Sequence, residues 1–214
     1  MRLTAPAVAI LLVTACHTRS QSISTVRPSA GAKLTGSIGY LSCDSNCGDG
    51  RVPAALRRPL RLPPSMTERP CPTSPAVAAG ILRIPGVATS FMVMGSPPIY
   101  IGFDPSVGRL GVAHWGAAQT AVNGRNVIKT LINIAPQYTG PVLLRGRRIP
   151  VGGAIAWGQG SPFTPSGDLQ LPPLTGPPAW RTTGFLLGFP GSGCYAVQAD
   201  TTAGSTVVVF AAAP

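Results

Sequence analysis

Acidic and other titratable side chains are scarce in this chain. The 214 residues include six Asp and Glu, only one of them Glu, and two His. Catalysis by a general acid and base, or by a bound metal, needs carboxylates, imidazoles or thiolates placed together. Within 71–214 the candidates are Asp104, Asp168, Asp200 and His114. The sequence therefore predicts a protein that is not an enzyme and that has neither a metal nor another cofactor.

Long apolar runs and sustained helical periodicity are also missing. No segment approaches the roughly twenty apolar residues that a membrane-spanning helix needs. The chain instead contains 26 Gly and 24 Pro, which separate short segments rich in β-branched and aromatic residues. This composition excludes a helical bundle and favours an all-β domain with many turns.

The first fifteen residues have the pattern of an export signal. Arg2 precedes the short apolar core Ala5–Val13, and Val13-Thr14-Ala15-Cys16 resembles the bacterial lipobox. In signals of that kind the cysteine becomes the lipidated first residue of the mature protein. We therefore predict a lipoprotein signal peptide over 1–15 and an extracytoplasmic protein, which acyl chains on Cys16 attach to the cell membrane. The alternative is an ordinary secretory signal that is cleaved nearby and leaves a chance cysteine.

Residues 16–70 have no sustained periodicity and are rich in Pro, Gly, Ser and Arg, which predicts a disordered tether. The prolines of 51–64 exclude a continuous amphipathic helix, so this basic stretch is expected to be extended and to lie near an acidic surface. Asp44, Asn46 and Asp49 do not have the spacing of a calcium loop. The four cysteines other than Cys16 suggest disulfides, and our preferred pairing is Cys43 with Cys47 and Cys71 with Cys194. Free buried thiols are the alternative for the second pair.

Residues 71–214 are long enough for one β-sandwich with a proper core. We expect strands at Ala76–Ile84, Thr89–Met94, Ile99–Phe103, Gly108–Ala113, Asn126–Ile134 and Ile149–Trp157, and a closing three-stranded meander over Thr182–Ala212. In Asn126–Ile134 the alternation predicts a core face made of Ile128, Thr130, Ile132 and Ile134. Residues 161–179 are expected to form a Pro-rich surface loop.

Several segments resemble an uncharacterised group of bacterial lipoproteins. They are Cys71-Pro72, NVIKTLINIAPQYTGPVLLRGRRI at 126–149, Trp180, and GCYAVQ at 193–198 followed by a valine strand. The group consists of secreted domains that end in a G-C-[WY]-x-[VLF] strand and one further strand. The resemblance implies an immunoglobulin-like antiparallel sandwich and implies no reaction.

Basic residues far outnumber acidic ones, with a formal net charge of +11. Arg145, Arg147 and Arg148 follow a predicted strand, and we expect a tight turn at Gly146 to direct these three guanidinium groups outward. Such a group suits the recognition of phosphate or carboxylate, and its alternative is a solvated hairpin tip. The predicted partners are the membrane, through the N-terminal lipid, and an anionic envelope polymer, which the charge favours, or a protein partner. Nucleic acid is not predicted, because no basic helix with interleaved aromatic residues is present.

The function that these features predict is a non-enzymatic binding or structural module at the cell envelope. One alternative is a carbohydrate-binding module, which requires exposed, coplanar aromatic rings. The other is an envelope hydrolase in which His114, beside Trp115, acts with Asp104 or Asp168. That hydrolase requires His114 to lie within hydrogen-bonding distance of one of the two carboxylates.

Overall fold

The structure is a computed structural model that describes residues 41–43, 52–63, 71–103, 111–114, 124–150, 152–158 and 166–214. These residues belong to one compact unit, Ile38–Pro214. The predicted signal peptide, Cys16, Cys47, Asp104 and Trp115 lie outside the described residues, as does the side chain of Cys43.

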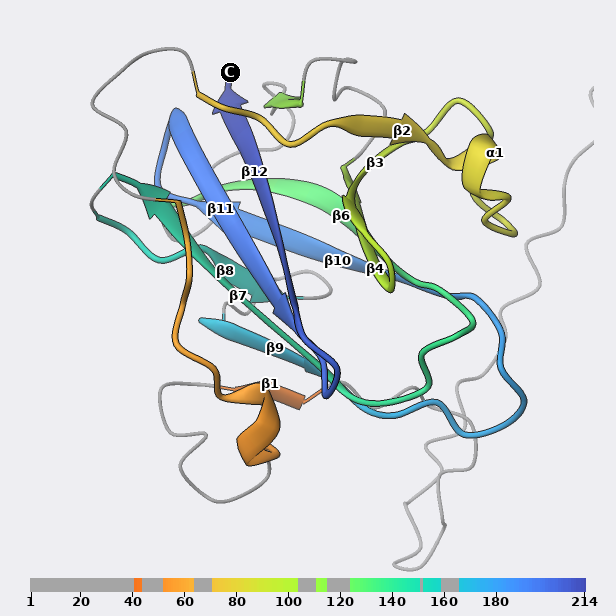
Figure 1. The fold of residues 1–214 in the computed structure, drawn as a ribbon. Coiled ribbons are helices and arrows are strands. Elements are labelled where there is room, and N and C mark those ends of the chain that lie inside the picture. Colours follow the sequence, from red (N-terminus) through yellow and green to blue (C-terminus); the bar gives the residue numbers. More distant parts are fainter. Residues whose placement is uncertain are drawn as a thin grey trace, which may run out of the picture. The chain divides into compact units, whose positions relative to one another are not determined.

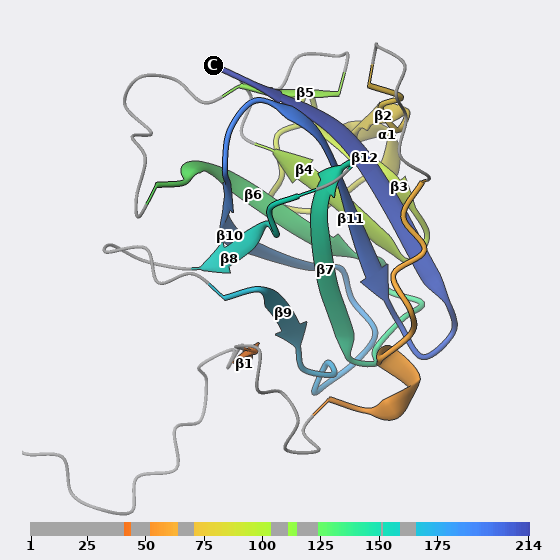
Figure 2. The same cartoon turned by 90° about the vertical axis from the view of Figure 1, so that its left-hand side faces the viewer.

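The described residues form an all-β sandwich of two six-stranded sheets, which confirms the predicted fold class (Figures 1 and 2). The first sheet has the order β1 (Leu41–Cys43), β9 (Asp168–Leu171), β7 (Val142–Ile149), β11 (Gly193–Asp200), β12 (Ser205–Ala213) and β5 (Val112–His114). The second has the order β2 (Ala76–Ala78), β3 (Met92–Ser96), β4 (Ile99–Phe103), β6 (Asn126–Ile134), β10 (Arg181–Phe189) and β8 (Ala156–Gly158). All neighbouring strands are antiparallel except β12 and β5, which pair in parallel.

The core lies between the sheets and follows from the alternation along each strand. On β6, Ile128, Thr130, Ile132 and Ile134 are buried, as predicted, while Lys129 is exposed on the opposite face. Aromatic side chains fill the centre, where Phe210 of β12 packs against Phe103 of β4 and Tyr195 of β11. This burial of large apolar surface is the main favourable contribution to folding.

The segment predicted as one long strand, Ala76–Ile84, differs from the structure. β2 ends at Ala78, and the next four residues form the short helix α1 (Ala79–Leu82). Gly80 lies so close to Thr89 that a Cβ would be 2.9 Å from the Thr89 Cβ. The helical turn thus lies directly against the segment before β3, where the backbone N–H of Gly80 donates to the Thr89 carbonyl at 3.1 Å.

The three closing strands are present as predicted, but they do not form one meander. β10 belongs to the second sheet, whereas β11 and β12 pair in the first. The turn at Pro190–Ser192 therefore carries the chain across the sandwich and is not a hairpin within a sheet. The last strand is buried at Val208, Val209 and Phe210, in agreement with its apolar sequence.

Gly146 does not form the predicted turn, because β7 continues through it as one strand. A Cβ on this residue would be 2.5 Å from both the Ala196 oxygen and the end of the Ile155 side chain. Gly146 is therefore needed for close packing and not for chain reversal. The chain reverses farther on, where Gly152 and Gly153 have positive φ values of 114° and 41°. Residues 161–179, which we predicted to be a surface loop, include the strand β9.

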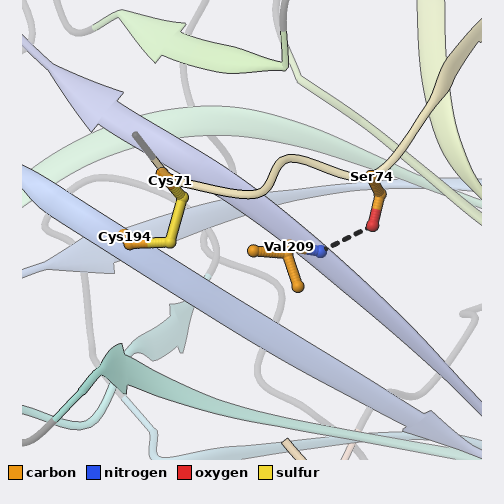
Figure 3. Close-up of a disulfide and its surroundings, with 4 residues drawn as sticks. All are labelled: Cys71, Ser74, Cys194 and Val209. Atoms are coloured by element: carbon orange, nitrogen blue, oxygen red, sulfur yellow. Dashed lines mark hydrogen bonds between the residues drawn. A yellow bond between two sulfur atoms is a disulfide. The ribbon is translucent and has the colours of Figure 1, made fainter. Parts of the chain in front are cut away.

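The predicted disulfide between Cys71 and Cys194 is present in the structure (Figure 3). It joins the segment before β2 to β11, across a sequence separation of 123 residues. Nearby, the hydroxyl of Ser74 accepts a hydrogen bond from the backbone N–H of Val209 at 2.9 Å. Together these contacts attach the start of the predicted domain to the outer face and edge of the first sheet.

Candidate binding face

Residues 52–63, which we call the strap, lie against the outer face of the first sheet. They fall within 16–70, which we predicted to be a disordered tether. In the structure Val52 and Leu56 are buried and form an apolar cluster with Leu143 of β7. Leu56 is held in the short 3-10 turn Ala54–Leu56. In Figure 2 the strap is the orange segment that ends near one end of β7. The strap is thus a packed part of the sandwich.

The middle of the strap is held by hydrogen bonds to side chains and carbonyls of the first sheet. Gln198 of β11 accepts from the backbone N–H of Arg61 at 2.7 Å and donates to the Pro59 carbonyl at 3.1 Å. The guanidinium of Arg58 donates to the Gly204 carbonyl at 3.1 Å, to the Thr202 carbonyl and to the Thr201 carbonyl. These contacts fix the position of the strap along β11.

Beneath the strap lies an ion pair between two strands of the first sheet. Arg145 of β7 donates to Asp200 of β11 at 2.6 Å, and the side chain of Asp200 is completely buried. Arg145 also donates to the Arg58 carbonyl of the strap. Asp200 further accepts hydrogen bonds from the Gln198 amide at 2.9 Å and from the Ser205 hydroxyl. A buried carboxylate is stabilised when several donors satisfy it together, as here.

The three arginines predicted to act together are divided between the two faces of β7. Strand alternation places Arg145 and Arg147 on the outer face and Arg148 on the opposite one. Arg148 donates to the Ser192 carbonyl at 2.8 Å, and Arg145 is largely buried in its ion pair. Arg147 is exposed, and its guanidinium has no hydrogen-bond or ion-pair partner among the described residues. Of the three, Arg147 is therefore the one available to a partner.

A hollow of about 430 Å³ lies beside Arg147, at the margin of the strap. Its lining includes Arg145 and Arg147 of β7, Asp168 of β9, and the small residues Gly146, Gly152 and Ala154. Leu60 of the strap, an exposed apolar side chain, contributes to one wall. The hollow thus combines a free cation, a carboxylate and an apolar surface. Its volume falls within the range of small-molecule sites.

Burial raises the pKa of Asp168, and the positive charge of Arg145 opposes that rise. The side chain of Asp168 has no hydrogen-bond donor among the described residues, although its backbone carbonyl accepts from Ser166. Asp168 thus retains unused acceptor capacity at the hollow. Asp200 differs from it in this respect, because protein donors surround its carboxylate.

Comparison with known proteins adds no relative. No protein family, no curated protein and no solved structure matches the chain. Within the described part of the chain, no helix is both long and apolar enough to span a membrane. The same residues contain no group of three or more His, Cys, Asp or Glu side chains placed to hold a metal ion.

His114, the most site-like residue of the sequence, lies far from Asp168. It is exposed on β5, where its Nδ1 is 3.1 Å from the Pro214 carbonyl oxygen. Three strands of the first sheet separate β5 from β9, which carries Asp168. At about 4.8 Å for each strand-to-strand step, the two strands are roughly 19 Å apart. The structure therefore does not bring His114 to Asp168, while Asp104 and Trp115 lie outside the described residues.

The described aromatic side chains form no exposed, coplanar pair. Trp157 and Tyr195 are almost completely buried in the core, and Tyr138 and Tyr100 are also buried. Trp180 is partly exposed, but its ring is tilted by 44° to that of Tyr100. The platform that the carbohydrate alternative requires is therefore absent from this part of the chain.

Gln198, Asp200 and Leu60 contribute to this face, although we did not predict their roles from the sequence. The sequence nevertheless contained a signal that two of these side chains share the outer face. Gln198 and Asp200 alternate with Val197 and Ala199, which face the core. The complete burial of these two polar side chains depends on partners from the strap and β7, more than fifty residues away.

Proposed function

We propose that the protein is a lipid-anchored, non-enzymatic binding module of the cell envelope. In this proposal Cys16 carries the lipid, and the partner is an anionic polymer or surface of the envelope. The module attaches to it through the outer face of the first sheet. The anchor and the location rest on the lipobox-like sequence before Cys16. The binding role rests on the charges of the described face.

The observation that carries the binding role is the unequal exposure of opposite charges. Arg57 and Arg61 of the strap and Arg147 of β7 are exposed on or beside this face. The acidic side chains among the described residues are those of Asp168, which is partly buried, and Asp200, which is completely buried. Because the acidic side chains are buried or partly buried and the basic side chains reach solvent, the face attracts anions.

Co-sedimentation with native envelope fractions across a salt series tests this role. The full chain is used with Cys16→Ser, so that no lipid contributes to binding. Contacts between exposed charges weaken as salt rises, and we expect binding to fall steeply. Binding that persists at high salt would contradict a charge-based attachment and would favour the carbohydrate alternative. The absence of binding at every salt concentration would contradict the proposal and point to a protein partner or a spacer.

Two matched double variants separate this face from net charge alone. Arg61→Ser with Arg147→Ser removes two exposed charges from the proposed face without touching the Arg145–Asp200 pair. Arg83→Ser with Lys129→Ser removes two exposed charges from other parts of the surface. At about 0.2–1 kcal/mol for each exposed contact, the first pair should weaken binding roughly two- to thirtyfold. Equal losses from both pairs would show that no particular face binds.

A further inference from the structure

The hollow beside Arg147 contains polar groups that the protein itself leaves unsatisfied. Arg147 is exposed without a partner among the described residues, and the carboxylate of Asp168 accepts no hydrogen bond there. The Nε of Arg145 is buried and also has no hydrogen-bond partner. Arg147 and Asp168 reach solvent and line the hollow, so they are the groups that a ligand there can contact, whereas the buried Nε of Arg145 is not accessible to it.

The spacing of these groups follows from the pairing of β7 with β9. Asp168 lies directly opposite Arg145, so Arg147 is its diagonal neighbour on the same face. Diagonal neighbours in antiparallel strands have Cα atoms about 7–8 Å apart. Arg147 and Asp168 form no ion pair with each other, and the glycines and alanine of the lining place no large side chain between them. A ligand group therefore fits between the cation and the carboxylate.

We infer that the hollow binds an acidic sugar unit, in which a carboxylate and hydroxyl groups belong to the same small ring. Arg147 binds the carboxylate with two parallel hydrogen bonds, which its planar guanidinium favours. Asp168 accepts hydrogen bonds from the hydroxyl groups, and the exposed side chain of Leu60 covers an apolar edge of the ring. The inference rests on the proposed binding role and specifies which unit of an anionic polymer this face recognises.

The charges of the site favour this ligand over simpler ones. A plain carboxylate would satisfy Arg147 and leave Asp168 without a donor. A neutral sugar would satisfy Asp168 and leave Arg147 unused. The carboxylate of Asp168 can accept from hydroxyl groups, and the positive charge of Arg145 lies beside it. Arg145 and Arg147 are the charged groups on β7 beside it, and Asp200 is already neutralised by Arg145.

Titration of the full Cys16→Ser chain with D-glucuronate, monitored by calorimetry, tests the inference. D-glucose and acetate are the matched probes, because each has half of the required chemistry. We expect glucuronate to bind at least about tenfold more tightly than either, since a charge-assisted pair is lost with glucose and the hydroxyl contacts with acetate. Equal affinity for glucuronate and acetate would overturn the inference, because hydroxyl recognition would then be missing.

Four variants then locate the site. Arg147→Gln should weaken glucuronate binding at least about tenfold, and Asp168→Ala should weaken glucuronate binding without weakening that of acetate. Ala154→Leu adds bulk to the lining and should abolish binding without changing any charge. Lys129→Gln, on the outer face of the second sheet, should change nothing. Binding that survives Ala154→Leu in a variant with an unchanged thermal unfolding curve would overturn the assignment to this hollow.

The same variants distinguish failure of this inference from failure of the proposed function. If glucuronate does not bind but salt-sensitive attachment to envelope fractions still depends on Arg61 and Arg147, the hollow is not an acidic-sugar site and the binding role stands. If neither glucuronate nor envelope fractions bind, both are wrong. If glucuronate binds and Ala154→Leu weakens attachment to envelope fractions, both are supported.

Discussion

Removing the carboxylate of Asp200 should destabilise the sandwich through the contacts beneath the strap. Asp200 is completely buried and accepts hydrogen bonds from Arg145 at 2.6 Å, from Gln198 at 2.9 Å and from Ser205. In Asp200→Ala these donors lose their acceptor, and Arg145 keeps an unpaired charge. Removing one partner of a buried ion pair lowers the free energy of unfolding by about 3–5 kcal/mol. Because 17% of the Arg145 side chain is exposed and water can solvate it, we expect about 3 kcal/mol.

Urea unfolding with the disulfide intact measures this loss in the free energy of unfolding. Arg145→Met, which leaves Asp200 charged and buried, should have a similar effect. The double variant should be less destabilised than the sum of the two single variants, by about 2 kcal/mol, because the residues are in direct contact. Lys129→Met, at an exposed position of the second sheet, is the control and should change stability by no more than about 0.5 kcal/mol.

Hydrogen exchange of the strap amides provides an independent readout. The Arg61 amide should exchange faster in Asp200→Ala, since Gln198, its acceptor, is held in place by Asp200. The reasoning would be refuted if the two single losses added in the double variant. It would also be refuted if Asp200→Ala cost less than about 1 kcal/mol, because a buried ion pair would then not hold this region.

The remaining predictions concern the disulfide and Asp168. Replacing Cys71 and Cys194 together by Ser should lower the free energy of unfolding by about 5 kcal/mol in the chain-entropy estimate for a loop of this length, and an unchanged urea midpoint would contradict it. Because burial raises the pKa of Asp168, the folded protein retains this proton to a higher pH than the unfolded chain. The carboxyl group's contribution to stability therefore falls as the pH rises through that raised pKa. Relative to the original chain, Asp168→Asn should gain stability with rising pH in urea unfolding, and a difference independent of pH would contradict this.

The fold class and much of the core could be predicted because strand alternation is a local signal. On β6 one set of alternate residues is apolar apart from Thr130, and those residues face the core. The three closing strands were predicted from another local signal, namely short segments rich in β-branched and aromatic residues between turn residues. Alternation does not show to which of the two sheets a strand belongs. The assignment of β10, β11 and β12 to one meander was wrong for that reason.

The candidate site could be predicted only in part, because its neighbours come from distant positions. The pattern at 145–148 drew attention to Arg147, but Gly146 was interpreted as a turn. Its actual role is to make room for Ile155 and the backbone of Ala196, fifty residues farther along the chain. Nothing near Gly146 in the sequence distinguishes a glycine required by packing from one required by a turn. The division of the arginines between two faces follows directly from that distinction.

The strap escaped prediction because its composition is that of a linker. Its prolines prevent regular secondary structure, and its apolar residues Val52 and Leu56 are too few to show a period. The strands of the first sheet give a clearer signal than the strap itself. Their outer face contains the apolar residues Ile149, Ala196 and Val209, which cluster with Leu62 of the strap. An apolar outer face on a sheet indicates that some other segment covers it.

The apolar and polar contacts of the strap have different consequences for the face that remains. Burial of Leu56 at one end and contact of Leu62 at the other attach the strap without fixing its position along β11. The directional hydrogen bonds of Gln198 and Arg145 fix that position. In this position Arg145 and Asp200 are covered and satisfied, whereas Arg147 and Asp168 lie beside the strap with no partner among the described residues. The binding candidates are therefore the charged groups of this face that the strap leaves unsatisfied. A strap displaced along β11 would leave a different pair unsatisfied, so disruption of the Gln198 contacts should alter ligand binding even though Gln198 does not line the hollow.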